Sequence, residues 1–264
     1  MTLLTEPTRI VLRRTWQPMD SDAAAYITAV ETADGQALEE KTKIAIDNFV
    51  LGCKADGIWS AIKASCILAG ARTLNGALVP LAGTAPTNVN FVSGDYNRKT
   101  GLLGNGSGKY LNSNRNNNAD PQNSKHIAAF ITAAGAGSST SVMGTDTVAS
   151  GGSWLTRNTD NTTSAQRANS AATYAYTNAF PISSKLLGVS RSASAAQSHI
   201  AAGGVQSSTI VSASPTNENI LVFRALGIFS SFRLAFYSIG ESLDLALLDA
   251  RVTDLINAFA AAIP

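Results

Sequence analysis

Residues 232–239 read FRLAFYSI and carry the alternation of side chains that is typical of a β-strand. Phe232, Leu234 and Phe236 occupy alternate positions, and a single residue, Arg233 in the first case, stands between each two of them. Neighbouring side chains are therefore expected on opposite faces of the strand. The stretch predicts an extended segment close to the C-terminal end of the sequence.

The sequence before this strand, from residue 70 onward, has the same character. Asp and Glu become scarce, helical spacing stops, and turn-forming residues recur about every 8–12 positions. This spacing is typical of an all-β sandwich or barrel. The run GNGSGK at residues 104–109 resembles a phosphate-binding loop only superficially. Strand-like sequence follows it where such a loop needs a helix, so we expect a hairpin turn.

Both ends of the sequence show helical spacing instead. Between residues 19 and 69, apolar residues recur at intervals of three and four, and Gly35 and Gly57 end two successive helices. A short third helix is expected to start at Ile58. Residues 243–263 carry an apolar stripe about one third of the helix circumference wide, which predicts a C-terminal helix.

The residues before the helical region form a further zone. Arg9, Arg13, Arg14 and Trp16 lie in a stretch that favours extended structure. This arm is either an edge strand of the main domain or a docking segment that binds another protein. The expected organisation is an N-terminal docking arm (1–18), a helical region (19–69), a β-sandwich (70–241) and a C-terminal helix (242–264) packed on the sandwich or the helical region.

The composition excludes several classes of function. Charged residues make up 14% of the 264 residues, against about 25% in typical soluble proteins. The net charge of +2 gives no basic field for nucleic acid. No apolar stretch is long enough to span a membrane, and no secretory signal is expected at the N-terminus. Cys53 and Cys66 are expected to be buried thiols, which suits synthesis in a reducing cytoplasm.

Acidic residues are too scattered in the β zone to predict a catalytic pair. Hydrolysis of a glycosidic bond usually needs two carboxylates. Between the helical zones the acids are Asp95, Asp120, Asp146, Asp160 and Glu218, and most occupy positions typical of turns. His126 and His199 stand alone on predicted strands, without the nearby ligands of a zinc site. We therefore expect no enzyme activity, no catalytic residues, no metal site and no cofactor.

Asparagines and aromatic residues in the β zone are candidates for ligand binding. Exposed aromatic rings can stack on sugars while asparagine and glycine make polar contacts. The candidate ligand-binding residues are Tyr96, Asn114, Asn116, Asn117, Trp154, Tyr174 and Tyr176. The alternative is that the aromatic rings fill the sandwich core and that the asparagine-rich loop at residues 112–120 is a structural element.

Four stretches carry a family resemblance. They are residues 58–64 (IWSAIKA), 83–90 (GTAPTNVN), 100–111 (TGLLGNGSGKYL) and 232–243 (FRLAFYSIGESL). They resemble tailed-bacteriophage virion structural proteins in which a helical segment leads into a concanavalin A-like (laminin G-like) jelly roll. The resemblance implies a concanavalin A-like jelly-roll β-sandwich and a place in the virion. Fold alone does not determine function, because this jelly roll also serves lectins, adhesins and hydrolases.

The resemblance implies a tail fibre or baseplate component that attaches to host-surface glycan, made in the host cytoplasm and then carried in the virion. The alternatives are a capsid decoration (cement) or tail-assembly protein without a receptor role, and an envelope-degrading glycosidase. Expected partners are other virion proteins and further copies of the chain, with a trimer expected by analogy. Nucleic acid and membrane insertion are not expected.

Overall fold

The computed structural model describes residues 16–135, 140–180 and 185–264. Arg9, Arg13 and Arg14 of the predicted arm lie outside these residues. The helices are α1 (Ser21–Asp34), α2 (Glu40–Ala55), α3 (Leu74–Ala77) and α4 (Leu245–Ala262), with short 3-10 turns η1 (Trp59–Ala61), η2 (Ser93–Asp95) and η3 (Asn117–Ala119).

The strands of the described ranges form two antiparallel sheets. The nine-stranded sheet contains β1 (Ile62–Ile67), β2 (Pro80–Ala82), β4 (Tyr96–Asn97), β5 (Gly101–Leu103), β7 (Lys125–Ala133), β12 (Lys185–Ala193), β13 (Ala196–Ala201), β14 (Gly204–Ser208) and β18 (Arg233–Gly240). The seven-stranded sheet contains β3 (Thr87–Val89), β6 (Tyr110–Asn116), β8 (Thr140–Gly144), β9 (Trp154–Arg157), β10 (Ser164–Arg167), β11 (Tyr174–Tyr176) and β15 (Asn219–Val222). A small hairpin, β16 (Arg224–Ala225) and β17 (Ile228–Phe229), follows β15.

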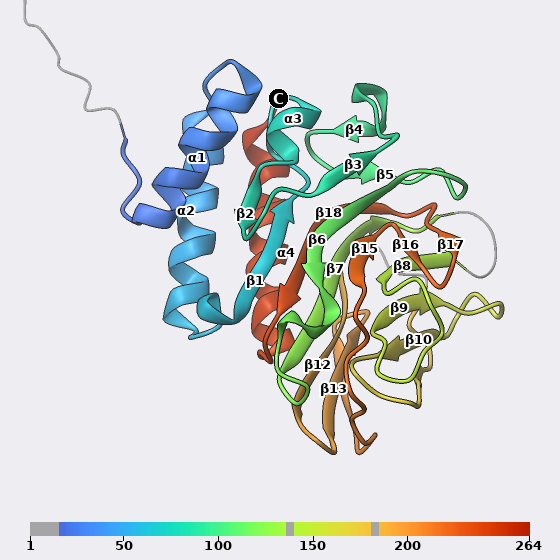
Figure 1. Ribbon diagram of the computed structural model, residues 1–264. Helices are drawn as coiled ribbons and strands as arrows, with labels where there is room; N and C mark the ends of the chain where they lie inside the picture. Colours follow the sequence, from blue (N-terminus) through green and yellow to red (C-terminus); the bar gives the residue numbers. More distant parts are fainter. Residues whose placement is uncertain (1–15, 136–139, 181–184) are drawn as a thin grey trace, which may run out of the picture.

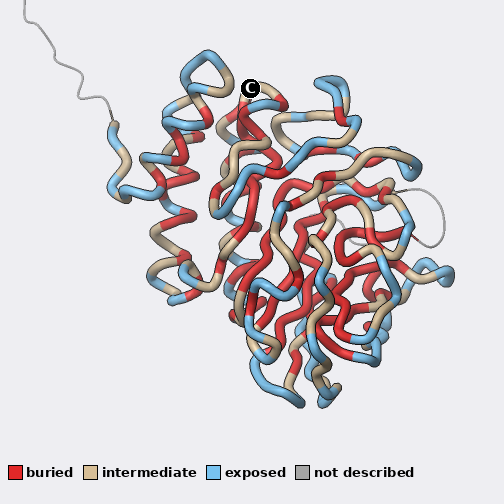
Figure 2. Tube along the Cα trace, viewed as in Figure 1, coloured by how far each residue is buried: buried red, intermediate tan, exposed pale blue. Residues whose placement is uncertain are grey.

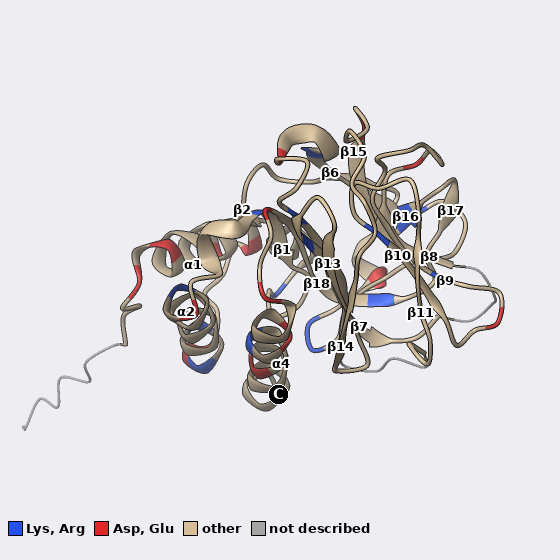
Figure 3. Ribbon diagram, turned by 90° about the horizontal axis from the view of Figure 1, so that it is seen from below, with Lys and Arg blue, Asp and Glu red and all other residues tan. Residues whose placement is uncertain are grey.

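The molecule has three layers. Helices α1, α2 and α4 cover one face of the nine-stranded sheet, and the seven-stranded sheet packs on the other face (Figure 1, Figure 3). One apolar core lies between the helices and the sheet and the other lies between the two sheets, so burial concentrates along the central strands (Figure 2). The predicted β-sandwich with an N-terminal helical region and a C-terminal helix is confirmed.

Strand β18 lies at the centre of the nine-stranded sheet, between β7 and β1. Leu234 and Tyr237 face the core between the sheets, whereas Ala235 and Phe236 both face the helices. The predicted strict alternation is therefore wrong beyond residue 234, because the register with β7 shifts between Leu234 and Phe236. Such an irregularity moves the later side chains to the opposite face.

Residues 62–67 form strand β1, where the sequence predicted a helix. β1 pairs with β18, with Ser65 opposite Ser238. Its side chains serve both cores, since Ile62 faces the helices and Cys66 faces the second sheet. A strand covered on both faces carries apolar residues on both of them, so periodicity does not separate it from a buried helix.

The loop at residues 104–109 does not form the predicted hairpin. β5 before it belongs to the nine-stranded sheet, and β6 after it belongs to the seven-stranded sheet. The Asn105 side chain accepts hydrogen bonds from the backbone N–H groups of Ser107, Gly108 and Lys109. The loop is thus a crossover between sheets, held by its own asparagine.

Gly35 ends the first helix as predicted, and side chains cap the starts of α1 and α4. Asp20 accepts hydrogen bonds from Asp22 and Ala23 at the start of α1, and Gly35 ends that helix with φ +68°. Asp244 caps α4 in the same way. Within the described residues, no helix combines the length and apolar character needed to cross a bilayer.

Candidate functional site

Two of the predicted ligand-binding aromatic residues are buried. Trp154 is 4% exposed and Tyr176 is 5% exposed, so neither offers an open ring face. The Arg167 guanidinium lies 4.2 Å from the centre of the Trp154 ring, and Tyr176 donates a hydrogen bond to the Gly204 carbonyl. The prediction of exposed stacking rings is wrong for these two residues, which pack as the alternative interpretation expected.

Tyr96 and Tyr174 are half-buried and lie in different parts of the fold. The Tyr96 hydroxyl donates to the Ala71 carbonyl at 2.7 Å, beneath the helical layer. The Tyr174 ring stacks on His199 with centroids 4.0 Å apart, and its hydroxyl donates to Gln206. The predicted aromatic residues therefore do not form one surface.

The asparagine-rich loop holds neighbouring loops together. Asn114 donates to the Ala85 carbonyl at 2.8 Å, and Asn116 donates to Asn217 at 2.8 Å. Asn117 is fully buried and donates to the Gly151 carbonyl at 2.9 Å. Asn114 and Asn116 stay partly accessible, but these contacts favour the interpretation of the loop as a structural element.

A buried group of charges anchors this loop. Asp120 pairs with Arg115 and with Lys125, whose Nζ lies 2.9 Å from the carboxylate and is fully buried. Burial alone would raise the pKa of Asp120, but the hydrogen bond from Arg115 and the charge of Lys125 bring the pKa below its usual value. Lys125 also donates to the Asn117 carbonyl, which fixes the start of η3.

The other four acids of the β zone each have partners. Asp95 pairs with Lys109, and Asp146 pairs with Arg224. Glu218 accepts hydrogen bonds from the backbone N–H groups of residues 146 and 147, and Asp160 accepts from those of residues 162 and 163. In the part of the chain that the structure describes, no group of three or more His, Cys, Asp or Glu residues is arranged to hold a metal ion.

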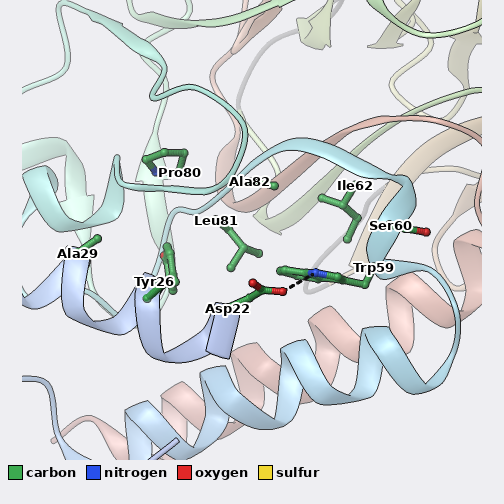
Figure 4. Close-up of a pocket in the computed structure, with 10 residues that line it drawn as sticks. Asp22, Tyr26, Ala29, Trp59, Ser60, Ile62, Pro80, Leu81 and Ala82 are labelled. Carbon is green, nitrogen blue, oxygen red and sulfur yellow. Dashed lines mark hydrogen bonds between the residues drawn. The ribbon is translucent and has the colours of Figure 1, made fainter. Parts of the chain in front are cut away.

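A pocket of about 440 Å³ opens between helix α1 and strands β1 and β2, at one edge of the nine-stranded sheet (Figure 4). We call it the α1–β2 pocket. Its lining residues are Asp22, Ala25, Tyr26, Ala29, Trp59, Ser60, Ile62, Pro80, Leu81 and Ala82. This volume falls within the range of about 300–1,000 Å³ that is usual for small-ligand sites.

Trp59 and Asp22 are the residues of this pocket with the clearest binding chemistry. The indole Nε1 of Trp59 donates to the Asp22 carboxylate at 3.1 Å, which fixes the half-buried ring against the pocket (Figure 4). Lys54 lies 2.7 Å from the same carboxylate and 5.7 Å from the centre of the indole ring. The Asp22 side chain is 52% exposed and keeps acceptor capacity for a ligand.

The backbone explains why these residues meet. Asp22 lies in the first turn of α1, and Trp59 begins η1 directly after α2 and Gly57, which has φ +72°. Lys54, in the last turn of α2, pairs with the cap residue Asp20 and so ties the two helix ends together. Its hydrogen bond with Asp20 raises the pKa of Lys54 and lowers the pKa of Asp20.

The sequence interpretation missed the α1–β2 pocket. The sequence predicts a short helix at Trp59, and it predicts no binding role for Asp22 or Ser60. The only sequence signal is a tryptophan just after a helix-ending glycine, since nothing local connects Trp59 to an acid 37 residues earlier. Their contact depends on the packing of α1 beside η1.

The sequence matches no protein-family model, and a search of curated proteins finds no match. Solved structures do show a similar fold. The receptor binding domain of botulinum neurotoxin C/D mosaic serotype superposes with a TM-score of 0.52 at 12% identity, over 73% of this chain and 51% of that chain.

Two further solved structures superpose less closely. Mouse laminin alpha1 chain domains LG4-5 align with a TM-score of 0.40 at 14% identity, over 63% of this chain and 47% of that one. Trypanosoma rangeli sialidase aligns with a TM-score of 0.46 at 10% identity, over 76% of this chain and 32% of that one. This chain thus corresponds to about half or less of each of these chains. The likeness to the toxin domain, with its TM-score of 0.52, shows that the two share a β-sandwich fold.

Proposed function

We propose that the protein is a carbohydrate-binding, non-enzymatic component of a bacteriophage virion that attaches to host-surface glycan through the α1–β2 pocket. The observation that carries the proposal is the partly exposed Trp59 indole held beside the Asp22 carboxylate in an open pocket. The virion assignment rests on the sequence resemblance. The likeness to a toxin receptor binding domain supports the fold of the proposed domain.

The pocket combines the two kinds of contact that a sugar needs. The indole and the side chains of Ile62 and Leu81 offer apolar surface to the C–H groups of a sugar ring. The Asp22 carboxylate and the Ser60 hydroxyl offer hydrogen bonds to sugar hydroxyls. Asp22 is the only carboxylate among the lining residues, so the pocket lacks the pair that glycoside hydrolysis usually needs.

A glycan array of bacterial surface saccharides tests this function. We expect the wild-type protein to bind a defined set of glycans and Trp59→Ala to bind them at least tenfold more weakly. Asp22→Asn should weaken binding less, because the amide keeps one acceptor oxygen. Trp16→Ala is the matched control, since Trp16 is also half-buried but lies outside the α1–β2 pocket.

The array has two outcomes that contradict the proposal. One is a folded wild-type protein that binds no glycan. The other is Trp59→Ala binding at wild-type strength, which would place the glycan elsewhere. Circular dichroism of each variant separates loss of binding from loss of fold.

A role in virion assembly is the second candidate function. Trp16 packs against the helical core, and the backbone N–H of Met19 donates to Asp47 at 3.1 Å. The chain is therefore held on the helical layer at the point where the predicted docking arm ends. In this candidate function, the predicted docking arm would bind another virion protein next to the helical layer.

A further inference from the structure

Strand β14 ends the nine-stranded sheet at the edge opposite to the α1–β2 pocket. Within the described residues, its only strand partner is β13. The first four of its five residues are exposed, and Val205 is 49% exposed. A strand at the end of a sheet presents unpaired N–H and C=O groups that can pair with another extended segment.

The other strands that end the two sheets differ from β14. β2, β3 and β11 have three residues each and β4 has two. β2 also contains Pro80 and lies beside α1. Short length, proline and a covering helix are the usual means by which proteins prevent pairing at an edge. β14 has five residues and no proline, and no helix among the described residues covers its free edge.

The residues of the β13–β14 hairpin carry no charged side chain. Residues 192–217 contain no Asp, Glu, Lys or Arg, although the chain has 20 basic and 18 acidic residues. Charged positions are instead visible along α1, α2 and α4 (Figure 3). A lysine pointing outward often prevents pairing at natural sheet edges, and residues 192–217 contain none, so β14 itself has no charge to repel a second identical strand.

The turn before β14 determines which backbone groups face outward. Ala202 and Gly203 have φ +50° and +79°, as in a two-residue type I′ turn, with Ala201 opposite Gly204. The two residues that flank such a turn exchange backbone hydrogen bonds. Along the ladder, hydrogen-bonded pairs then alternate with open pairs, in which the two residues make no backbone hydrogen bonds to each other. The N–H and C=O groups of Val205 and Ser207 therefore point away from β13.

We propose that β14 of one molecule pairs antiparallel with β14 of a second copy, about a two-fold axis at Gln206. This arrangement places Val205 opposite Ser207 of the second copy in both halves, so the outward groups meet in two hydrogen-bonded pairs. At the axis, Gln206 of one molecule lies opposite Gln206 of the second copy, and these two residues form a pair without hydrogen bonds between their backbones. The edge is self-complementary because it carries no charge and has outward groups at equal distances from Gln206.

The pairing leaves the α1–β2 pocket accessible in each copy. β14 and β2 are at opposite ends of the nine-stranded sheet, so the joined sheets would carry one pocket at each outer end. The inference does not depend on glycan binding. Multi-angle light scattering tests it separately, because the method measures mass without a ligand.

The wild-type protein is expected to have twice the 27.4-kDa mass of the chain at micromolar concentration. Val205→Lys should weaken the dimer at least tenfold by placing charge at the edge. Ser207→Pro should do the same by removing an outward N–H, and an edge strand tolerates proline at such a position. Val148→Lys is the matched control, because Val148 is 78% exposed in the β8–β9 loop and its variant should remain dimeric.

A cysteine at the axis tests the register. In an open antiparallel pair the two Cα atoms are about 4.5 Å apart, within the range that a disulfide spans. Gln206→Cys should therefore form a cross-linked dimer under mild oxidation, whereas Val148→Cys should not. Cys53 and Cys66 are buried and free in the structure, so they give no background.

Three results would overturn the proposal. The first is a monomeric wild-type protein at 100 micromolar, a concentration about 1,000 times the Kd of a 100 nM complex. The second is a dimer that neither edge variant weakens although both variants fold. The third is a dimeric Gln206→Cys variant that does not cross-link. If both edge variants fail to fold, the cross-linking result alone decides.

Discussion

The imidazole of His199 stacks on the ring of Tyr174, with centroids 4.0 Å apart and planes inclined by 18°. His199 belongs to β13 and Tyr174 to β11, so the contact joins the two sheets directly. The ring nitrogens of His199 also lie within hydrogen-bond distance of Gln166 and Ser208. The histidine is fully buried, and protonation would place a charge between the sheets.

Acid is expected to destabilise the protein because His199 and His126 are both buried. Burial lowers the pKa of each histidine to about 4, from an ordinary value of 6.5. The unfolded chain therefore binds more protons between pH 6.5 and 4, and the free energy of unfolding falls as the pH drops through this window. Urea unfolding from pH 7.5 to 4.5 should show a loss of up to about 3 kcal/mol per histidine.

His199→Gln separates this effect from general acid sensitivity. The variant should be less stable at pH 7, because it loses the stacking contact with Tyr174. Its stability should also fall less steeply between pH 6.5 and 4.5 than that of the wild type. An unchanged slope would show that His199 does not titrate differently in the folded and unfolded states.

Removing the Asp120 carboxylate should be strongly destabilising. Asp120→Ala leaves Lys125 fully buried without its carboxylate partner. Breaking a buried ion pair from one side typically costs about 3–5 kcal/mol. Urea denaturation should show a loss of this size, and Asp120→Ala combined with Lys125→Met should recover part of it. Asp160→Asn, at an exposed turn, should stay within about 0.5 kcal/mol of the wild type.

Gly101 is expected to tolerate no side chain. Its φ is +95°, and a Cβ atom there would lie 2.1 Å from the carbonyl oxygen of Leu234 in β18. Gly101→Ala should therefore destabilise the protein by about 3 kcal/mol or more. Thermal unfolding of this variant beside Gly94→Ala checks the prediction, because a Cβ at Gly94 meets nothing within 4 Å. Equal melting temperatures for the two variants would contradict it.

Deletion of residues 1–14 tests the assembly role. If these residues dock the protein in the virion, the truncated chain should keep its circular dichroism spectrum and melting temperature but be absent from purified particles. Fold should persist because Trp16 and the helical layer remain. Particles that incorporate the truncated chain normally would show that the arm has no docking role.

The sequence predicted those parts of the fold that depend on local signals. Gly35 marks the end of α1, and the apolar stripe over residues 243–263 marks α4. The sandwich followed from the spacing of turns. By contrast, β1 was predicted as a helix because its apolar side chains serve two cores, and pairing with β18 depends on residues far away in the sequence.

The candidate site was the least predictable feature. The prediction of ligand-binding aromatic residues depends on residue type alone. Trp154 and Tyr176 are in fact buried, in contact with Arg167 and Gly204 respectively. Trp59 was predicted only as part of a short helix, yet it lines the α1–β2 pocket. Exposure of a tryptophan is decided by the surrounding elements, and the local sequence carries little information about it.

The position of β18 has a consequence for how the protein is made. β18 connects β7 to β1, so without it the nine-stranded sheet separates into two parts. Synthesis runs from the N-terminus, and residues 233–240 are made after every other strand of the nine-stranded sheet. Strands β1 and β7 therefore complete their pairing only after β18 has been made, which gives the sheet a high contact order. A nascent chain that stalls before this strand would expose the apolar edges of β7 and β1 to chaperones.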